Sequence, residues 1–234
     1  MGYDGAPIEL WFGQSLWWLR PLGDRAVRIE LAEPQMSLAS SGLVYALNSA
    51  LHPLLMHGVQ ALVPAYASLT ALLQPSADFD EAVHRIISFL SSTDMLALAT
   101  RAVNPVVDLQ LLPEPGLDAP TLADAFGLSI EQLLQHFCSA QYQVAQIGFR
   151  AGFPYLLGLP AALSFPRRAT PRTHVPGLSV AIGGAQAGIY PAAGPGGWHI
   201  IGQIAQPLFN AAGFAERAGS PCWLAPGDLV RFVC

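Results

Sequence analysis

The sequence predicts a mixed fold in which a small α+β N-terminal domain precedes an all-β C-terminal domain. Strand and helix signals alternate over residues 1–100. After Gly127 the apolar segments are short, and Pro and Gly interrupt them every few residues. Short strands joined by such turns are typical of a barrel or sandwich. We therefore divide the chain into residues 1–100 and residues 101–234.

The first N-terminal elements are a strand and a helix. Val27, Ile29 and Leu31 alternate with charged side chains, which predicts a half-buried strand. Ser37 is placed to cap a helix whose apolar residues recur at helical spacing, and Pro53 is expected to end it.

The rest of the N-terminal half predicts two strands and a second helix. Short apolar segments lie at 59–63 and 68–73. Asp78 with Glu81 resembles a capping box that precedes an amphipathic helix. The predicted order is strand, strand, helix, strand, strand, helix, which indicates a compact α+β domain.

The C-terminal half begins after residues 91–103, which resemble a linker or a frayed helix end. Alternation over 106–111 predicts a strand, and a short helix is expected to open at Thr121. Ser129 with Gln132 forms a second capping-box signal. Short strands are then expected in four segments: 142–149, 180–182, 198–204 and 229–233.

Composition excludes several classes of protein. Of the 234 residues, 52% are hydrophobic and 12% are charged, which excludes a disordered chain. A net charge of −5 argues against nucleic-acid binding. Residues 173–215 carry no charged side chain, but Pro and Gly interrupt them too often for a membrane helix. Because the N-terminus lacks a basic segment before an apolar run, we expect a cytoplasmic protein.

The absence of Lys and the small number of Cys residues limit further which catalytic and binding sites the chain can form. Because the chain has no Lys, it excludes a Lys Schiff base, the Lys of a P-loop and a site for attached biotin. Any bound anion must be held by Arg or by backbone N–H groups. Cys138, Cys222 and Cys234 are odd in number and widely spaced. We expect free thiols, with no disulfide framework and no metal site.

An arginine cluster is one candidate site. Arg167, Arg168 and Arg172 lie within a segment made stiff by Pro166 and Pro171. Forked guanidinium groups in this pattern suit the recognition of carboxylate or phosphate. A solvated surface loop explains the cluster equally well.

Three glycine-rich stretches form the second candidate, at 148–155, 183–190 and 194–198. Glycines let a backbone approach a ligand closely, and the interleaved aromatic residues suit a pocket wall or a partner interface. Tight turns between strands are the alternative. Common catalytic motifs are absent from the sequence, and His136 is expected on the flank of a helix.

An ordered series of short motifs resembles the KipI and allophanate hydrolase subunit 1 family, whose members include the B subunit of bacterial 5-oxoprolinase. The series covers nearly the whole chain, and its order and spacing carry the resemblance. Its main members are Leu22-Gly23-Asp24-Arg25-Ala26-Val27, Gly127-Leu128-Ser129, Ile147-Gly148-Phe149, Gly152-Phe153-Pro154-Tyr155, Pro166-Arg167-Arg168, Gly188-Ile189-Tyr190-Pro191, Pro195-Gly196-Gly197-Trp198 and Pro226-Gly227-Asp228-Leu229-Val230-Arg231-Phe232.

The resemblance implies a cyclophilin-like β-barrel for the C-terminal domain and a role among partner subunits. It implies that the B-type and C-type subunits activate 5-oxoproline with ATP, bound as its Mg complex and shared with a partner. The A-type subunit then completes hydrolysis to glutamate. A lactam is a poor electrophile, so phosphorylation of its carbonyl oxygen makes ring opening feasible. The isolated chain is therefore expected to be inactive.

Together, the clusters and the resemblance select the site residues. The expected catalytic residues are His136, Arg167 and Arg172. The expected substrate- or nucleotide-binding residues are Phe149, Gly152, Phe153, Arg168, Gln186, Tyr190, Gly196, Gly197 and Trp198. The chain departs from the family pattern at Ala151, Ala187, Gln203 and Ile204, and such losses leave an altered substrate or an inactive member open. The alternatives are a KipI-like inhibitor that binds a sensor histidine kinase and a relative that acts on allophanate or urea.

Overall fold

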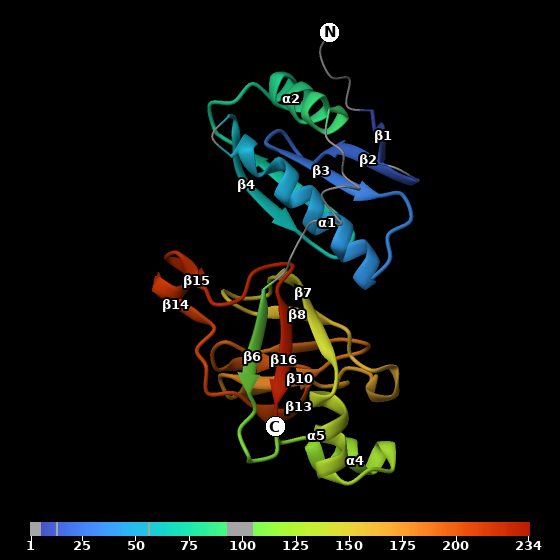
Figure 1. The fold of residues 1–234 in the computed structure, drawn as a ribbon, viewed down its shortest axis with the longest axis vertical. Helices are drawn as coiled ribbons and strands as arrows, with labels where there is room; N and C mark the ends of the chain where they lie inside the picture. The colour runs from blue at the N-terminus through green and yellow to red at the C-terminus, as the bar shows by residue number, and fades with distance from the viewer. Residues whose placement is uncertain (1–5, 13, 56, 93–104) are drawn as a thin grey trace. The chain divides into compact units, whose positions relative to one another are not determined.

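The computed structural model describes residues 6–12, 14–55, 57–92 and 105–234 (Figure 1). The chain forms two compact units, Met1–Val103 and Asn104–Cys234, and each is described by itself. The predicted boundary between residues 100 and 101 lies outside the described residues, and so does most of the predicted linker at 91–103.

The N-terminal unit is a five-stranded antiparallel sheet with two helices. The strand order is β1-β2-β3-β5-β4. Its elements are β1 (Ile8–Phe12), β2 (Ser15–Pro21), β3 (Ala26–Leu31), α1 (Leu38–Leu51), the 3-10 turn His52–Leu54, β4 (Val59–Pro64), β5 (Ser68–Leu73) and α2 (Phe79–Ser91). Three strands precede α1, so the prediction of two was wrong. The sequence pattern located only β3 by its residues, and β1 and β2 pair with each other ahead of it.

Local sequence signals explain the starts of both helices and the end of α1. The Ser37 hydroxyl accepts a hydrogen bond from the N–H of Ser40 at 3.1 Å, and the Asp78 carboxylate accepts one from Glu81 at 2.9 Å. Each side chain satisfies a backbone donor that has no partner inside the helix. Pro53 lies in the 3-10 turn that directly follows α1, as its missing N–H requires.

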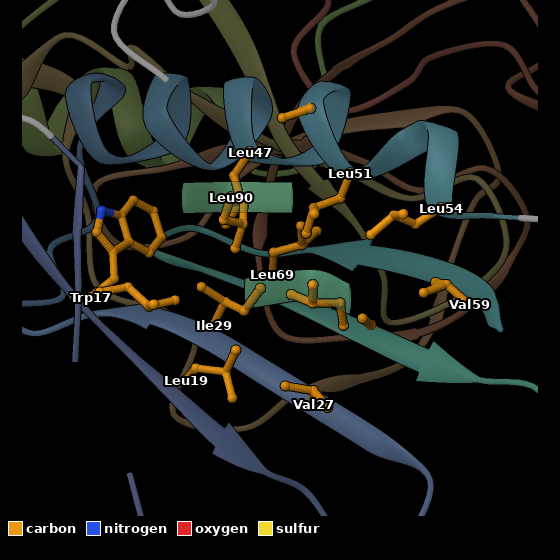
Figure 2. Packing of buried hydrophobic residues seen from close by; sticks show 14 of the residues in the cluster. Trp17, Leu19, Val27, Ile29, Leu47, Leu51, Leu54, Val59, Leu69 and Leu90 are labelled. Atoms are coloured by element: carbon orange, nitrogen blue, oxygen red, sulfur yellow. The ribbon is translucent and has the colours of Figure 1, made fainter. Parts of the chain in front are cut away.

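One apolar core fills the N-terminal unit (Figure 2). Val27 and Ile29 of β3 are fully buried, whereas Arg28 between them is exposed, so the predicted alternation is confirmed. Leu47 of α1 and Leu90 of α2 pack toward the same side chains. The period-two pattern of the strand and the helical spacing of α1 and α2 therefore converge on one buried layer.

The C-terminal unit is built mainly from short strands. Its elements are β6 (Val106–Gln110), α4 (Ala119–Phe126), α5 (Ile130–Cys138), β7 (Gln141–Ile147), β8 (Pro154–Leu157), the 3-10 turn Ala161–Leu163, β9 (Arg172–Val175), β10 (Ser179–Ile182), β11 (Ala187–Ile189), β12 (Gly194–Gly196), β13 (His199–Gln203), β14 (Phe209–Phe214), the 3-10 turn Ala215–Arg217, β15 (Ser220–Cys222) and β16 (Leu229–Val233). β12 pairs with β9, and β14 pairs with β15, in two small separate sheets.

The main sheet of this unit curls until its two edges meet. Its strand order is β13-β10-β11-β8-β7-β16-β6, and the contact of β16 with β6 is parallel. Directly after β6, Leu111 bridges Ile204, which directly follows β13. The N–H of Leu112 also donates to Gln203 at 2.8 Å. Both edges of the sheet are thereby paired, and the curl encloses an apolar core.

Two helices pack against this sheet. Ser129 and Gln132 form the predicted capping box at the start of α5. α4 begins at Ala119, before the expected Thr121, and its N-cap residue is Asp118. The Asp118 side chain makes no hydrogen bond to the helix, because it is turned toward another part of the unit.

The prediction of three free thiols was wrong. A disulfide joins Cys138, the last residue of α5, to Cys234 at the C-terminus, and Cys222 is free. The two cysteines are 96 residues apart, but their Cα atoms lie 6.3 Å apart because α5 packs beside β16. A spacing rule applied to the sequence does not detect such a long-range contact.

Loss of this disulfide is expected to destabilise the C-terminal unit. Cys138→Ser should lower its free energy of unfolding by about 2–4 kcal/mol, because the unfolded chain loses a long loop constraint. Thiol titration of the non-reduced, denatured wild type should find one free thiol, that of Cys222. Three reactive thiols in that sample would contradict the disulfide.

Candidate functional site

A cavity of about 340 Å³ in the C-terminal unit brings most of the predicted site residues together. This volume lies in the usual range of small-molecule sites. The side chains around it are mainly aromatic, and two are arginines. The lining residues are Phe149, Phe153, Tyr155, Arg167, Arg168, Pro171, Tyr190, Pro195, Gly196, Gly197 and Trp198.

Phe153 is the centre of an aromatic cluster in the cavity wall. Its ring centroid lies 4.9 Å from that of Tyr155, 5.2 Å from Tyr190 and 5.7 Å from Trp198. The contacts are tilted or edge-to-face, which is the favoured geometry of aromatic pairs. Phe153 and Tyr190 are each 2% exposed, so the wall is held by buried packing.

The glycines of the predicted site make room for these rings. A Cβ on Gly183 would overlap the indole of Trp198, and one on Gly196 would overlap the hydroxyl of Tyr190. A Cβ on Gly188 would lie 2.9 Å from both Phe153 and Trp198. The packing of aromatic side chains is therefore enough to require glycine at these three positions. The prediction that these glycines let the backbone approach a ligand stays a prediction.

Arg167 is the available cation of the cavity. Its guanidinium carbon lies 5.3 Å from the ring centroid of Trp198, in a cation–π contact. Arg167 is exposed, and it makes no ion pair with any residue that the structure describes. Its hydrogen-bond donors are thus available to bind an anion beside the indole face.

Arg168 and Arg172 are held by the buried carboxylate of Asp118. Arg172 donates two hydrogen bonds, of 2.8 and 2.6 Å, in a bidentate pair. Arg168 donates one of 3.2 Å, and the N–H of Ile200 donates another of 2.8 Å. Asp118 is 4% exposed, so a buried anion is satisfied by four donors from sequence-distant segments.

Two pKa shifts follow from this packing. Burial favours the protonated Asp118 carboxyl, but the hydrogen bonds from Arg172 and Ile200 outweigh it and hold the pKa of Asp118 below its usual value. Burial also raises the pKa of Tyr190. The Tyr190 phenol therefore stays protonated at neutral pH, and its oxygen accepts a hydrogen bond from the N–H of Trp198 at 3.4 Å.

Four of the predicted site residues lie outside the cavity. His136 is exposed on α5. Gln186 is buried in the turn between β10 and β11. Gly152 packs against Leu208, at a positive φ of 78° that favours glycine. Arg172, for which the sequence predicted a catalytic role, donates both of its terminal N–H groups to Asp118.

Sequence reasoning missed Asp118 and several lining residues. Tyr155, Pro171 and Pro195 lay within the noted motifs but were not selected. Asp118 gave one weak signal, since three clustered arginines in a domain poor in acids need a counter-charge. Among the described residues, no group of three His, Cys, Asp or Glu side chains is placed to hold a metal ion. In the same part of the chain, no helix is both long and apolar enough to cross a membrane.

Comparisons with known proteins show which proteins this chain is similar to. A family model described as "Carboxyltransferase domain, subdomain C and D" matches residues 17–217. A relative from Escherichia coli O157:H7, named as the B subunit of 5-oxoprolinase, is 38% identical over 214 residues. These residues are 91% of this chain and 93% of that protein.

Solved structures share the fold. A crystal structure of TTHA0988 is similar with a TM-score of 0.75 and 31% identity, over 89% of this chain. The chain spans 39% of the length of TTHA0988. Urea amidolyase from K. lactis matches 97% of this chain and 15% of its own, with a TM-score of 0.68 and 18% identity, which establishes a shared fold alone.

Phe149 occupies an unusual position at the cavity rim. It is 60% exposed and has a φ of 66°, a left-handed conformation that is rare for a bulky residue. The guanidinium of Arg150 lies over its ring at 4.9 Å and donates to the carbonyls of Ala192 and Ala193. These contacts hold the rim in place against the backbone strain.

The positive φ of Phe149 predicts that glycine is more stable than alanine at this position, which is the reverse of the usual order. Phe149→Gly should be more stable than Phe149→Ala by about 1 kcal/mol, because both lose the ring but only Gly tolerates a positive φ. Urea unfolding of both variants measures the difference. Ala151→Gly is the matched control and should be less stable than wild type, since Ala151 has no positive φ. A Phe149→Ala variant that is the more stable of the pair would contradict the strain.

Proposed function

We propose, from the premise that this chain belongs to the carboxyltransferase domain C and D family, that it is the B-type subunit of an ATP-dependent 5-oxoprolinase. The expected resemblance to the KipI and allophanate hydrolase subunit 1 family is confirmed. The observation that carries the proposal is the similarity, over 91% of the chain, to a relative named as the B subunit of 5-oxoprolinase. The complete reaction converts 5-oxo-L-proline, ATP and water to L-glutamate, ADP and phosphate.

The cavity suits the small ring acid in this proposal. 5-Oxoproline has a flat five-membered lactam ring and one carboxylate. The carboxylate can pair with the guanidinium of Arg167 while the ring lies against Trp198 and Tyr190. The wall excludes water from these faces of the ring, which strengthens the ion pair. Arg168 also lines the cavity and adds a second guanidinium, which already donates one hydrogen bond to Asp118.

The charge of the cavity argues that ATP is held mainly by a partner. A triphosphate carries several negative charges. Among the residues that line the cavity, only Arg167 is an arginine without an acidic partner in the described chain, and the sequence has no Lys. We therefore assign the nucleotide, with its Mg, largely to the C-type subunit, and we assign ring opening to the A-type one.

Two further expectations belong to this proposal. The cyclophilin-like character of the barrel and a cytoplasmic location stay predictions. The Cys138–Cys234 disulfide argues against a cytoplasmic location, because disulfides are rare in the cytosol.

Reconstitution tests the proposed activity. This chain with A- and C-type subunits should consume 5-oxoproline only when ATP is present, and the chain alone should be inactive. The measurement is coupled production of glutamate and ADP. The same mixture without this chain is the control. A complete mixture that loses no 5-oxoproline would remove the proposal. A sensor kinase co-purifying from native cells, in place of the other subunits, would favour the KipI-like alternative.

Arg167 is expected to select for the substrate carboxylate. Arg167→Met keeps an apolar contact with Trp198 but removes the charge, so KM for 5-oxoproline should rise by about 10- to 100-fold, as expected for one charged hydrogen-bonded pair. Arg85→Met is the matched control, because Arg85 is an exposed arginine of α2. An unchanged KM in the Arg167 variant would exclude this assignment.

A further inference from the structure

The loop 166–172 and the strand β13 carry the two halves of the Arg167–Trp198 pair. Arg167 lies in the loop, and Trp198 directly precedes β13. The loop has little regular structure, since only Arg172 belongs to a strand. A long arginine side chain on such a loop has many accessible conformations. Something must therefore hold the loop on the strand if Arg167 is to stay over the indole.

Asp118 makes contact with both halves. One oxygen of its carboxylate accepts from Arg168 at 3.2 Å, and its two oxygens accept from Arg172 at 2.6 and 2.8 Å. These two arginines lie on the same loop as Arg167. The carboxylate also accepts from the N–H of Ile200, and the Asp118 N–H donates to the Ile200 carbonyl, each at 2.8 Å. Asp118 thus binds the strand two residues beyond Trp198.

Backbone contacts add to the attachment made by the carboxylate. The N–H of Arg168 donates to the carbonyl of Gly197 at 2.9 Å, and a ring nitrogen of His199 lies 3.0 Å from the carbonyl of Pro166. Both contacts lie at the first residues of the loop. At the far end of the loop, Arg172 pairs with Gly196 in the β9–β12 ladder, and its guanidinium is bound by Asp118. The carboxylate is therefore the side-chain link between this end of the loop and β13.

The geometry points to Asp118 as the positioning residue that holds Arg167 over Trp198 and so shapes the anion-binding side of the cavity. Asp118 does not line the cavity, and a carboxylate would repel an anion bound there, so its effect on binding must pass through the arginines. The inference deepens the proposed function and, for its substrate readout, rests on it. An amide at this position presents one acceptor and a donor, so it cannot satisfy four donors and leaves two guanidinium groups without a counter-charge.

Two readouts test Asp118→Asn. Limited trypsin digestion reports the loop itself, because trypsin cleaves after arginine and the loop contains Arg167 and Arg168. Cleavage in the loop should become faster by about tenfold or more as the anchored loop opens. In the reconstituted complex, KM for 5-oxoproline should rise by about tenfold or more with a smaller change in kcat, because Arg167 is misplaced before binding.

Asp108→Asn is the matched control. Asp108 forms a bidentate pair with Arg231 at 2.8 and 2.9 Å in the same unit, but the pair is exposed and lies outside the cavity lining. This variant should keep the loop cleavage rate and the KM of wild type. A merely stabilising role of Asp118 would lower the unfolding temperature while leaving both readouts unchanged.

If Asp118→Asn fails to fold, Arg172→Gln is the variant that replaces it in both measurements. Arg172 is also absent from the cavity lining, and its loss should produce the same faster cleavage and higher KM. A folded Asp118 or Arg172 variant with wild-type cleavage and wild-type KM would overturn the inference. If the wild-type complex itself has no turnover, the proposed function fails. The cleavage rates then still decide whether Asp118 holds the loop.

Discussion

A single buried carboxylate organises the candidate site. Asp118 receives donors from a loop, from the first residue of β9 and from the backbone of β13, which are brought together only by folding. A buried carboxylate without these partners would be strongly unfavourable, so the charge makes the three segments depend on one another. Arg168 and Arg172 are occupied by it, whereas Arg167 has no acidic partner among the described residues. The site therefore combines a satisfied buried cluster with one available cation.

The aromatic wall depends on a different constraint, which is space. Trp198 and Tyr190 reach their buried positions because Gly183, Gly188 and Gly196 have no side chains. Gly183 directly follows β10, Gly188 lies within β11 and Gly196 within β12. The fold brings the first two to Trp198 and the third to Tyr190. This packing explains Gly183, Gly188 and Gly196 in the uncharged segment 173–215. These three glycines and the aromatic wall thus belong to one arrangement of large rings.

Much of the fold follows from the sequence, because its signals are local. The caps at Ser37, Asp78 and Ser129 and the alternation of β3 depend on residues close together in the chain. The site was predicted in part, since its arginines and aromatics lie in short motifs. The disulfide and the Asp118 cluster were missed, because each joins residues separated by 50 positions or more. His136 was selected through the family resemblance, and the fold places it on an exposed helix face.

In the proposed complex, this chain holds a small cyclic acid for activation by a partner-bound nucleotide. Family kinship supports the reaction, and the cavity geometry supports the choice of residues. The most direct test is a crystal structure of the assembled complex with 5-oxoproline. We expect the ligand carboxylate within hydrogen-bond distance of Arg167 and the ring against Trp198. A ligand bound elsewhere, with this cavity empty, would contradict the assignment.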